Sequence, residues 1–182
     1  MAKTERYKEK TKKLRQISLE ERCETDLHNP VLKEGMKNLL QLCHNLKMKP
    51  IWYNGASYKC QYKKEAVAYI SVYNNKCLIA VATVNAADSA LRIGIDNFLR
   101  TLSGEMKTEF LSRIKFCDGC SELKSPHSCF PGCDVEIDGA IKKGVCVNTL
   151  RYKIDNPTKE QFEWIFKFII ARRDYINNNP KK

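Results

Sequence analysis

The sequence predicts an α+β fold, with one domain over residues 29–182 and a basic arm over residues 1–28 that precedes it. Three observations support this prediction. Hydrophobic residues make up 43% of the chain and charged residues 29%, as in ordinary globular domains. Apolar residues recur every three or four positions near both ends of the domain, which is typical of amphipathic helices. Between these segments, short aromatic and β-branched runs alternate with turn-forming pairs, which is typical of an antiparallel meander.

The N-terminal part is expected to be helical. The arm is polar and has little apolar periodicity, so we expect a mobile or loosely docked segment, with a helix over about residues 5–22 as one interpretation. Asn29 can cap a helix and Pro30 fits the first helical position. The helix that they start is predicted to end near Lys47. Its apolar stripe consists of Leu32, Met36, Leu39, Leu40, Cys43 and Leu46.

The chain changes from helical to strand periodicity near residue 51. An antiparallel meander of three or four strands is predicted within residues 51–83. Its strands are separated by the pairs Asn54-Gly55, Lys63-Lys64 and Asn74-Asn75. Beyond the meander, the alternation of Leu91, Ile93 and Ile95 favours a further strand over residues 90–95, and a helix over residues 89–102 is the alternative.

The last part of the chain is predicted to hold a helix, a short hairpin and a second helix. The apolar spacing over residues 104–116 indicates a helix that leads directly into Cys117. Asp138-Gly139 is a strong hairpin signal between two short strand-like runs. Asn156-Pro157 then starts a C-terminal amphipathic helix that is expected to end near Ile176.

The net charge of +11 favours an anionic partner, but its distribution favours solvating charge. Residues 1–15 contain seven Lys/Arg against two Glu, and residues 167–182 contain five against one Asp. Any nucleic-acid binding by these basic termini is therefore expected to be weak and independent of base sequence. The N-terminal residues are charged and no apolar run is long enough to cross a bilayer, so the sequence predicts a cytoplasmic protein with reduced thiols and no membrane contact.

The cysteine cluster at residues 117–146 is the strongest chemical signal. It holds five of the nine cysteines, and Cys117-Asp-Gly-Cys120 has the spacing of a zinc knuckle, in which one tight turn supplies two thiolates. The second pair of ligands is either Cys129 with Cys133 or Cys129 with Cys146, and His127 lies among them. An iron–sulfur cluster, a redox dithiol and inert buried thiols are the alternatives to structural Zn²⁺.

The same region resembles a family of small uncharacterised bacterial cytosolic proteins. In that family Cys-x-x-Cys is followed by Cys-x-Pro-Gly, a strand–turn–strand, Val-Cys and a helix started by Asn-Pro. The matching residues are Cys117, Cys120, Cys129-Phe130-Pro131-Gly132, Gly139, Val145-Cys146 and Asn156-Pro157. The resemblance implies that the metal ligands are Cys117, Cys120, Cys129 and Cys146, with Cys133 left over. It implies no activity.

Aromatic residues among the lysines of the meander are more often core on one face and scattered surface on the other. The alternative is a binding surface, because such rings can stack on bases or line an apolar pocket. We expect Trp52, Tyr58 and Tyr69 to form this ligand-binding face. Four thiolates leave zinc no open position for water, so the predicted function is a non-enzymatic zinc-containing binding module for a small apolar or planar ligand or a protein partner. The alternatives are a nucleic-acid-binding accessory protein that uses its basic termini, and a thiol-based redox sensor or enzyme.

Overall fold

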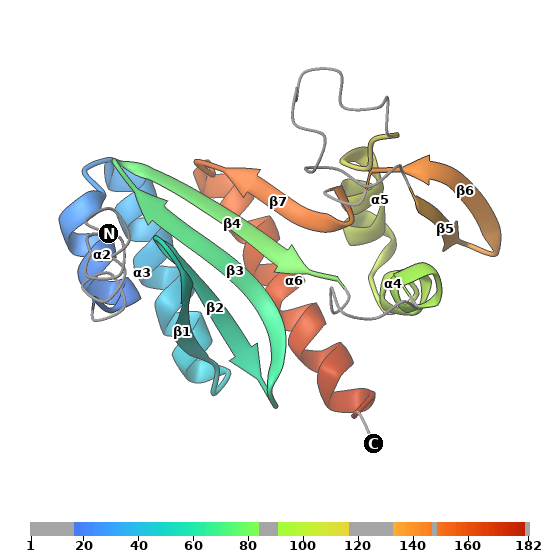
Figure 1. Ribbon diagram of the computed structural model, residues 1–182, viewed down its shortest axis with the longest axis horizontal. Helices are drawn as coiled ribbons and strands as arrows, with labels where there is room; N and C mark the ends of the chain where they lie inside the picture. Colours follow the sequence, from blue (N-terminus) through green and yellow to red (C-terminus); the bar gives the residue numbers. More distant parts are fainter. Residues whose placement is uncertain (1–16, 84–90, 117–132, 147–148, 181–182) are drawn as a thin grey trace, which may run out of the picture.

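The computed structural model describes residues 17–83, 91–116, 133–146 and 149–180. The α+β class predicted from the sequence is confirmed (Figure 1). The helices in these ranges are α2 (Leu19–Asp26), α3 (Pro30–Asn45), α4 (Leu91–Leu99), α5 (Gly104–Ser112) and α6 (Lys159–Asn178). The strands are β1 (Lys49–Asn54), β2 (Ser57–Tyr62), β3 (Glu65–Tyr73), β4 (Lys76–Ala82), β5 (Cys133–Ile137), β6 (Ala140–Val145) and β7 (Arg151–Asp155).

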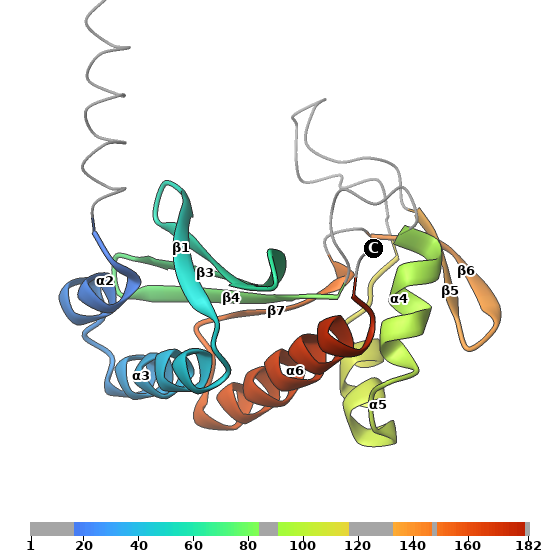
Figure 2. The ribbon, with the colours of Figure 1, turned by 90° about the horizontal axis from the view of Figure 1, so that it is seen from below.

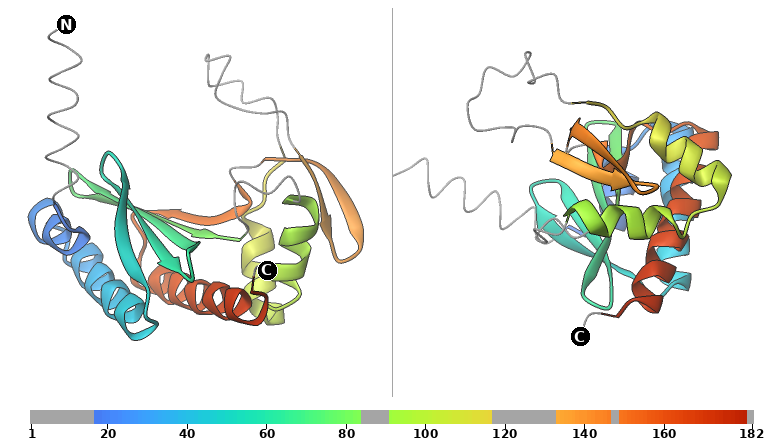
Figure 3. Two further views of the ribbon diagram at one scale, coloured as in Figure 1. Left: turned by 60° about the horizontal axis from the view of Figure 1, so that its bottom comes forward. Right: turned by 90° about the vertical axis from the view of Figure 1, so that its right-hand side faces the viewer.

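Five strands form one antiparallel sheet in the order β1-β2-β3-β4-β7. The predicted meander supplies the first four, and β7 returns from much later in the chain to pair with β4. Helices α3 and α6 lie along one face of this sheet, and the β1–β2 hairpin rises on the other side (Figures 2 and 3). The hairpin β5–β6 lies with α4 and α5 beyond the β7 edge (Figures 1 and 2).

Two-residue turns set the register of three of the hairpins, two in the five-stranded sheet and one between β5 and β6. Both central residues have a positive φ in the turns Lys63-Lys64, Asn74-Asn75 and Asp138-Gly139. This is the backbone conformation of a type I′ turn, whose twist matches that of the flanking strands. Asn and Gly adopt it readily, whereas two consecutive lysines do so at a cost in conformational energy.

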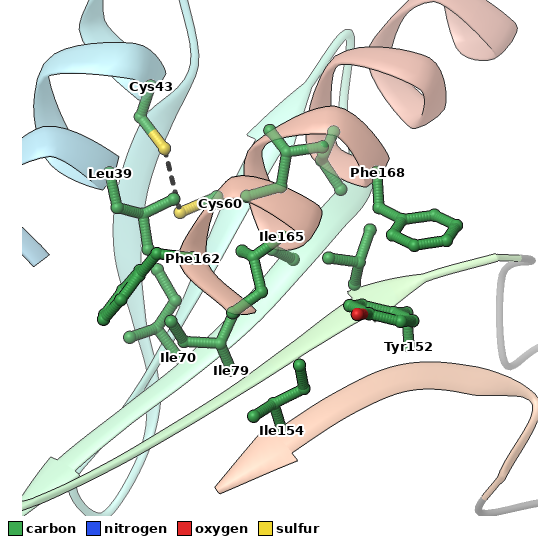
Figure 4. Close-up of a cluster of buried hydrophobic side chains, with 14 of the residues drawn as sticks. Leu39, Cys43, Cys60, Ile70, Ile79, Tyr152, Ile154, Phe162, Ile165 and Phe168 are labelled. Atoms are coloured by element: carbon green, nitrogen blue, oxygen red, sulfur yellow. Dashed lines mark hydrogen bonds between the residues drawn. The ribbon is translucent and has the colours of Figure 1, made fainter. Parts of the chain in front are cut away.

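The core fills the space between the sheet and the two long helices. Leu39 of α3, Ile70 and Ile79 of the sheet, and Ile165 of α6 are all fully buried there (Figure 4). At the β7 edge the Tyr152 ring stacks on Phe168 of α6, with ring centroids 4.0 Å apart. Burial of these apolar surfaces is the main source of stability and is independent of any ligand.

Helix α2 corrects the predicted extent of the basic arm. Leu19 and Leu27 are each 1% exposed, and the two backbone N–H groups that follow Leu27 donate to Asn75 Oδ1 in the β3–β4 turn. Residues 19–27 are therefore packed into the core instead of loosely docked. Residues 1–16, which hold most of the arm's charge, lie outside the described ranges.

The strand favoured over residues 90–95 is wrong, because Leu91–Leu99 is helix α4. The buried residues Ile95, Phe98 and Leu99 are spaced by three and four positions, so one helical face meets the core. The helices predicted over residues 30–47, 104–116 and 156–176 are confirmed, each with slightly different ends.

Candidate functional site

The face of the sheet opposite α3 and α6 carries the first candidate site, and we call it the open face (Figure 2). It consists of the odd-numbered residues Lys49–Tyr53, Ser57–Gln61, Tyr69–Tyr73 and Arg151–Asp155, and the even-numbered residues Lys76–Ala82. Side chains at directly paired positions share a face of a sheet, so the strand register defines this set. Its exposed members include Tyr53, whose side chain is 50% exposed.

One row of residues crosses all five strands of the open face. The register pairs Ile51 with Lys59, Lys59 with Tyr69, Tyr69 with Ala80, and Ala80 with Lys153. We call this set the central row. A half-buried tyrosine thus lies at its middle, with a methyl group on one side and a lysine on the other.

Aromatic rings and cations contact one another above the central row. The rings of Tyr53 and Tyr69 meet edge to face with centroids 5.4 Å apart. Lys59 Nζ lies 5.8 Å from the centroid of Tyr53, and the Arg151 guanidinium lies 5.1 Å from that of Tyr69. Both separations are within the range of a cation–π attraction.

The charge of the open face is strongly positive. Its basic residues are Lys49, Lys59, Lys76, Arg151 and Lys153, and its one acidic residue is Asp155. Within the described ranges, none of these five basic side chains forms an ion pair. The positive charge of the central row is therefore not neutralised by a described neighbour.

The prediction that Trp52, Tyr58 and Tyr69 share one face is wrong for Trp52 and Tyr58. Tyr58 is 2% exposed and lies on the helix-covered face, where its hydroxyl donates to Ile17 O at 2.7 Å and accepts from Arg22 Nε. Trp52 pairs with Tyr58 and packs against the same core. A β-bulge at Cys60/Gln61 is the cause, because it shifts the β2–β3 register by one residue and places Tyr58 opposite Ile70 instead of Tyr69.

The open face also contains residues that the sequence analysis did not select, namely Tyr53, Lys59, Arg151 and Lys153. Alternation along each strand could have found Tyr53 and Lys59, because they share the odd-numbered positions of β1 and β2. Arg151 and Lys153 could not have been found this way. They come from β7, whose position beside β4 depends on long-range pairing.

The cysteine cluster is the second candidate site, and the structure describes part of it. Cys117, Cys120, Cys129 and His127 lie outside the described residues. Cys146 has a partly exposed free thiol, and the backbone of Cys133 is in β5. Among the described residues no group of three or more His, Cys, Asp or Glu is placed to hold a metal ion.

The two ends of the segment between residues 116 and 133 meet beside Cys146. Val145 pairs with Cys133 on one side and with Phe116 on the other. The backbone N–H of Cys146 donates to Lys115 O at 2.9 Å, and Thr149 Oγ1 accepts from Lys115 N. One short patch of sheet thus brings together Phe116, Cys133 and Val145, which precede or belong to the cysteine cluster.

Helices α4 and α5 hold the hairpin β5–β6 in position. Asp96 of α4 is 4% exposed, and its carboxylate accepts from Asp138 N at 2.9 Å and from Arg100 Nε at 2.6 Å. Lys107 of α5 forms an ion pair with the Asp138 side chain. A buried carboxylate with both oxygens bonded is a strong anchor, because each broken bond would leave a desolvated charge.

Four further cysteines are buried in the core and have no metal-binding arrangement. Cys43 Sγ and Cys60 Sγ lie 3.8 Å apart in an S–H hydrogen bond (Figure 4), and this bond together with burial raises the pKa of the Cys60 thiol. Burial raises the pKa of Cys23 and of Cys77 to about 12. Thiols with such pKa values are neutral near pH 7, so they serve as small apolar packing groups.

Comparisons with protein-family models, with curated proteins and with solved structures found no match to this chain. Over the described residues, no helix has both the length and the apolar character needed to cross a membrane.

Proposed function

We propose that the protein is a cytoplasmic, non-enzymatic binding module that takes a planar ligand on its open face and holds a structural zinc ion in its cysteine cluster. The observation that carries the ligand proposal is the central row. It presents the half-buried Tyr69 ring between the short side chain of Ala80 and the long side chain of Lys59.

The contacts around Tyr69 suit a planar ligand with a polar or anionic substituent. Offset or edge-to-face contact between aromatic groups contributes about 0.5–1.5 kcal/mol beyond the burial of their surfaces. Tyr53 already makes an edge-to-face contact with Tyr69, so a planar ligand can contact both rings at once. Arg151 and Lys59, which lie over these rings, are in reach of a polar group at the edge of the ligand.

Adenosine, which has a planar base and carries no phosphate, is a suitable probe for this proposal. Titration of the full chain with millimolar adenosine, followed by backbone amide NMR, is expected to shift the signals of Tyr53, Lys59 and Tyr69. Tyr69→Ala should remove these shifts, and Tyr69→Phe, the matched control, should retain them because it keeps the ring. Shifts confined to residues outside the open face, or unchanged by Tyr69→Ala, would contradict the proposal.

The zinc proposal is supported by ligand chemistry and by the described ends of the cysteine segment. Cys117-x-x-Cys120 has knuckle spacing, and Phe116, Cys133 and Val145 are neighbours in one patch of sheet. The described ends of the cysteine segment thus lie beside Cys146, which supports its inclusion among the ligands. We propose Cys117, Cys120, Cys129 and Cys146 as the ligands, with zinc as a local organiser of this end of the molecule.

Elemental analysis of the purified protein, combined with a thiol count before and after chelation, tests the zinc proposal. We expect one zinc ion per chain, lost in Cys146→Ser and kept in Cys133→Ser. The opposite pattern would identify Cys133 as the fourth ligand. Iron with visible absorption in place of zinc would replace the proposal by an iron–sulfur cluster.

A further inference from the structure

We propose that the ligand of the open face is single-stranded nucleic acid, an inference that rests on the proposed binding function of that face. The charge of the face is the first observation in its favour. Five basic residues stand against the single carboxylate of Asp155, and within the described ranges the five form no ion pair. Such a surface attracts polyanions and repels other cationic surfaces.

The spacing of the cations favours a polymer over a mononucleotide. Lys59 and Lys153 both belong to the central row but are separated by three steps between neighbouring strands. At about 4.8 Å per step this is roughly 14 Å, which is too far for one phosphate to contact both. A chain of nucleotides that crosses the strands can place a phosphate at each lysine and a base on the ring of Tyr69 between them.

The rings favour single strands over duplexes. The bases of a duplex are stacked on one another, so their faces are not available to a protein side chain, whereas unpaired bases stack readily on aromatic residues. Tyr53 and Tyr69 are two such rings within 5.4 Å of each other. In the free protein the Arg151 guanidinium lies over Tyr69 at 5.1 Å. A stacked base takes its place there, and the guanidinium then contacts the adjacent phosphate.

The expected nucleic-acid contact thus lies on the sheet and not at the chain ends. The basic residues 1–15 would add a general attraction for any polyanion, independent of rings. Contact at the open face depends on Tyr69 as well as on charge. The two modes are therefore separable by removing the ring and the charges one at a time.

The test is the affinity of the full chain for a fluorescent eight-nucleotide RNA of mixed sequence, measured by anisotropy over a series of salt concentrations. Three contacting cations predict a slope of log K against log salt of about −2. Tyr69→Ala is expected to weaken binding by about 5- to 150-fold, the range for loss of one stacked base, while Tyr69→Phe retains it. Lys153→Gln is expected to reduce the slope by about 0.7.

Matched controls separate this site from the rest of the surface. Lys167→Gln removes one exposed charge from α6, on the other side of the sheet, and should leave affinity unchanged. The duplex of the same RNA should bind more weakly than the single strand. If Tyr69→Ala alters folding, Lys153→Gln still tests the proposal, because Lys153 is exposed and its substitution should leave the fold intact.

Several outcomes would overturn the proposal. One is no binding of the octamer at low salt; another is equal binding of heparin, a polyanion without planar groups, with no effect of Tyr69→Ala. Binding that survives Tyr69→Ala but disappears on deletion of residues 1–15 would assign the contact to the chain ends. Equal affinity for a dinucleotide and for the octamer would reject a polymeric ligand. In that case, shifts of the Tyr69 NMR signal on addition of adenosine would still support the broader proposal of a planar ligand.

Discussion

Substitution of Gly35 by Ala is the sharpest test of the packing that supports the open face. Gly35 lies in α3 where this helix crosses α6, and a Cβ atom there would be 2.1 Å from Phe162 Cε2 and 2.4 Å from Cδ2 and Cζ. The Phe162 side chain is 2% exposed and packs in the core. The two helices must therefore separate by about 1.3 Å to reach an ordinary contact distance of 3.4 Å.

Two opposing effects determine the size of the change. Alanine is favoured over glycine inside a helix by about 1 kcal/mol. Insertion of a methyl group into a packed core costs about 1–3 kcal/mol, and the large overlap here places the cost at the upper end of that range. We expect a net loss of about 2 kcal/mol, which for a chain of this size lowers the melting temperature by about 4–8 °C.

Thermal and urea unfolding followed by circular dichroism measure this loss. Gly104→Ala is the matched control, because a Cβ at Gly104 meets no atom within 4 Å, and its stability should be unchanged or slightly higher. Phe162→Leu in the Gly35→Ala background should recover part of the loss, giving a coupling energy of about 1 kcal/mol or more in a double-mutant cycle. A Gly35→Ala protein as stable as the parent would refute the reasoning.

Three further predictions concern the turns, the hairpin and the buried thiols. Lys64→Gly should raise the unfolding free energy by about 0.5–1 kcal/mol in thermal melts, because Lys64 has a φ of 67° that glycine adopts without strain; lower stability would contradict this. Asp96→Ala should accelerate amide hydrogen exchange in β5–β6 and leave β2–β4 protected, because it removes the acceptor of Asp138 N; unchanged exchange in the hairpin would refute the anchoring role. Cys23 and Cys77, with pKa values of about 12 when folded against 9.0 ordinarily, keep their protons longer when folded. Their contribution to the unfolding free energy is complete below pH 9. Between pH 9 and 12 it falls by up to about 1.4 kcal/mol per pH unit for each thiol. Cys23→Ala should therefore flatten the pH dependence of the urea midpoint in that range.

The elements that the sequence predicts well are those specified locally. Asn74-Asn75 and Asp138-Gly139 form the expected tight turns because Asn, Asp and Gly tolerate a positive φ. Asn29 caps α3, with Oδ1 accepting from the backbone N–H groups of Val31 and Leu32. Such signals depend on only a few neighbouring residues, so they can be recognised without knowledge of the tertiary structure.

The predictions from sequence are wrong where contacts between distant parts of the chain determine the local structure. The alternation of Leu91, Ile93 and Ile95 is compatible with a strand, but burial of Phe98 and Leu99 with Ile95 favours a helix. The bulge at Cys60/Gln61 has no sequence signal that separates it from an ordinary strand, yet it turns Tyr58 into the core and leaves Tyr69 on the opposite face. A one-residue shift in register thus changes which aromatic residues lie on the candidate ligand-binding face.

The link between the cysteine cluster and the sheet determines what removal of the proposed zinc ion should do. Tyr152 of β7 donates from its hydroxyl to Glu109 Oε1 at 2.7 Å, and Glu109 also pairs with Arg113 of the segment that leads to Phe116. Tyr152 itself is 1% exposed and stacked on α6, so β7 is held by the core without any help from the cluster.

Chelation should therefore increase hydrogen exchange in β5 and β6, while β7 and the four strands of the meander stay protected. Hydrogen exchange with mass spectrometry, compared before and after chelation, measures this directly. If instead β7 loses protection together with the hairpin, the cluster supports the Arg151 end of the open face, and metal removal should weaken RNA binding as well. Global unfolding on chelation would show that the metal, and not the burial of Ile70, Ile79 and their neighbours, holds the fold together.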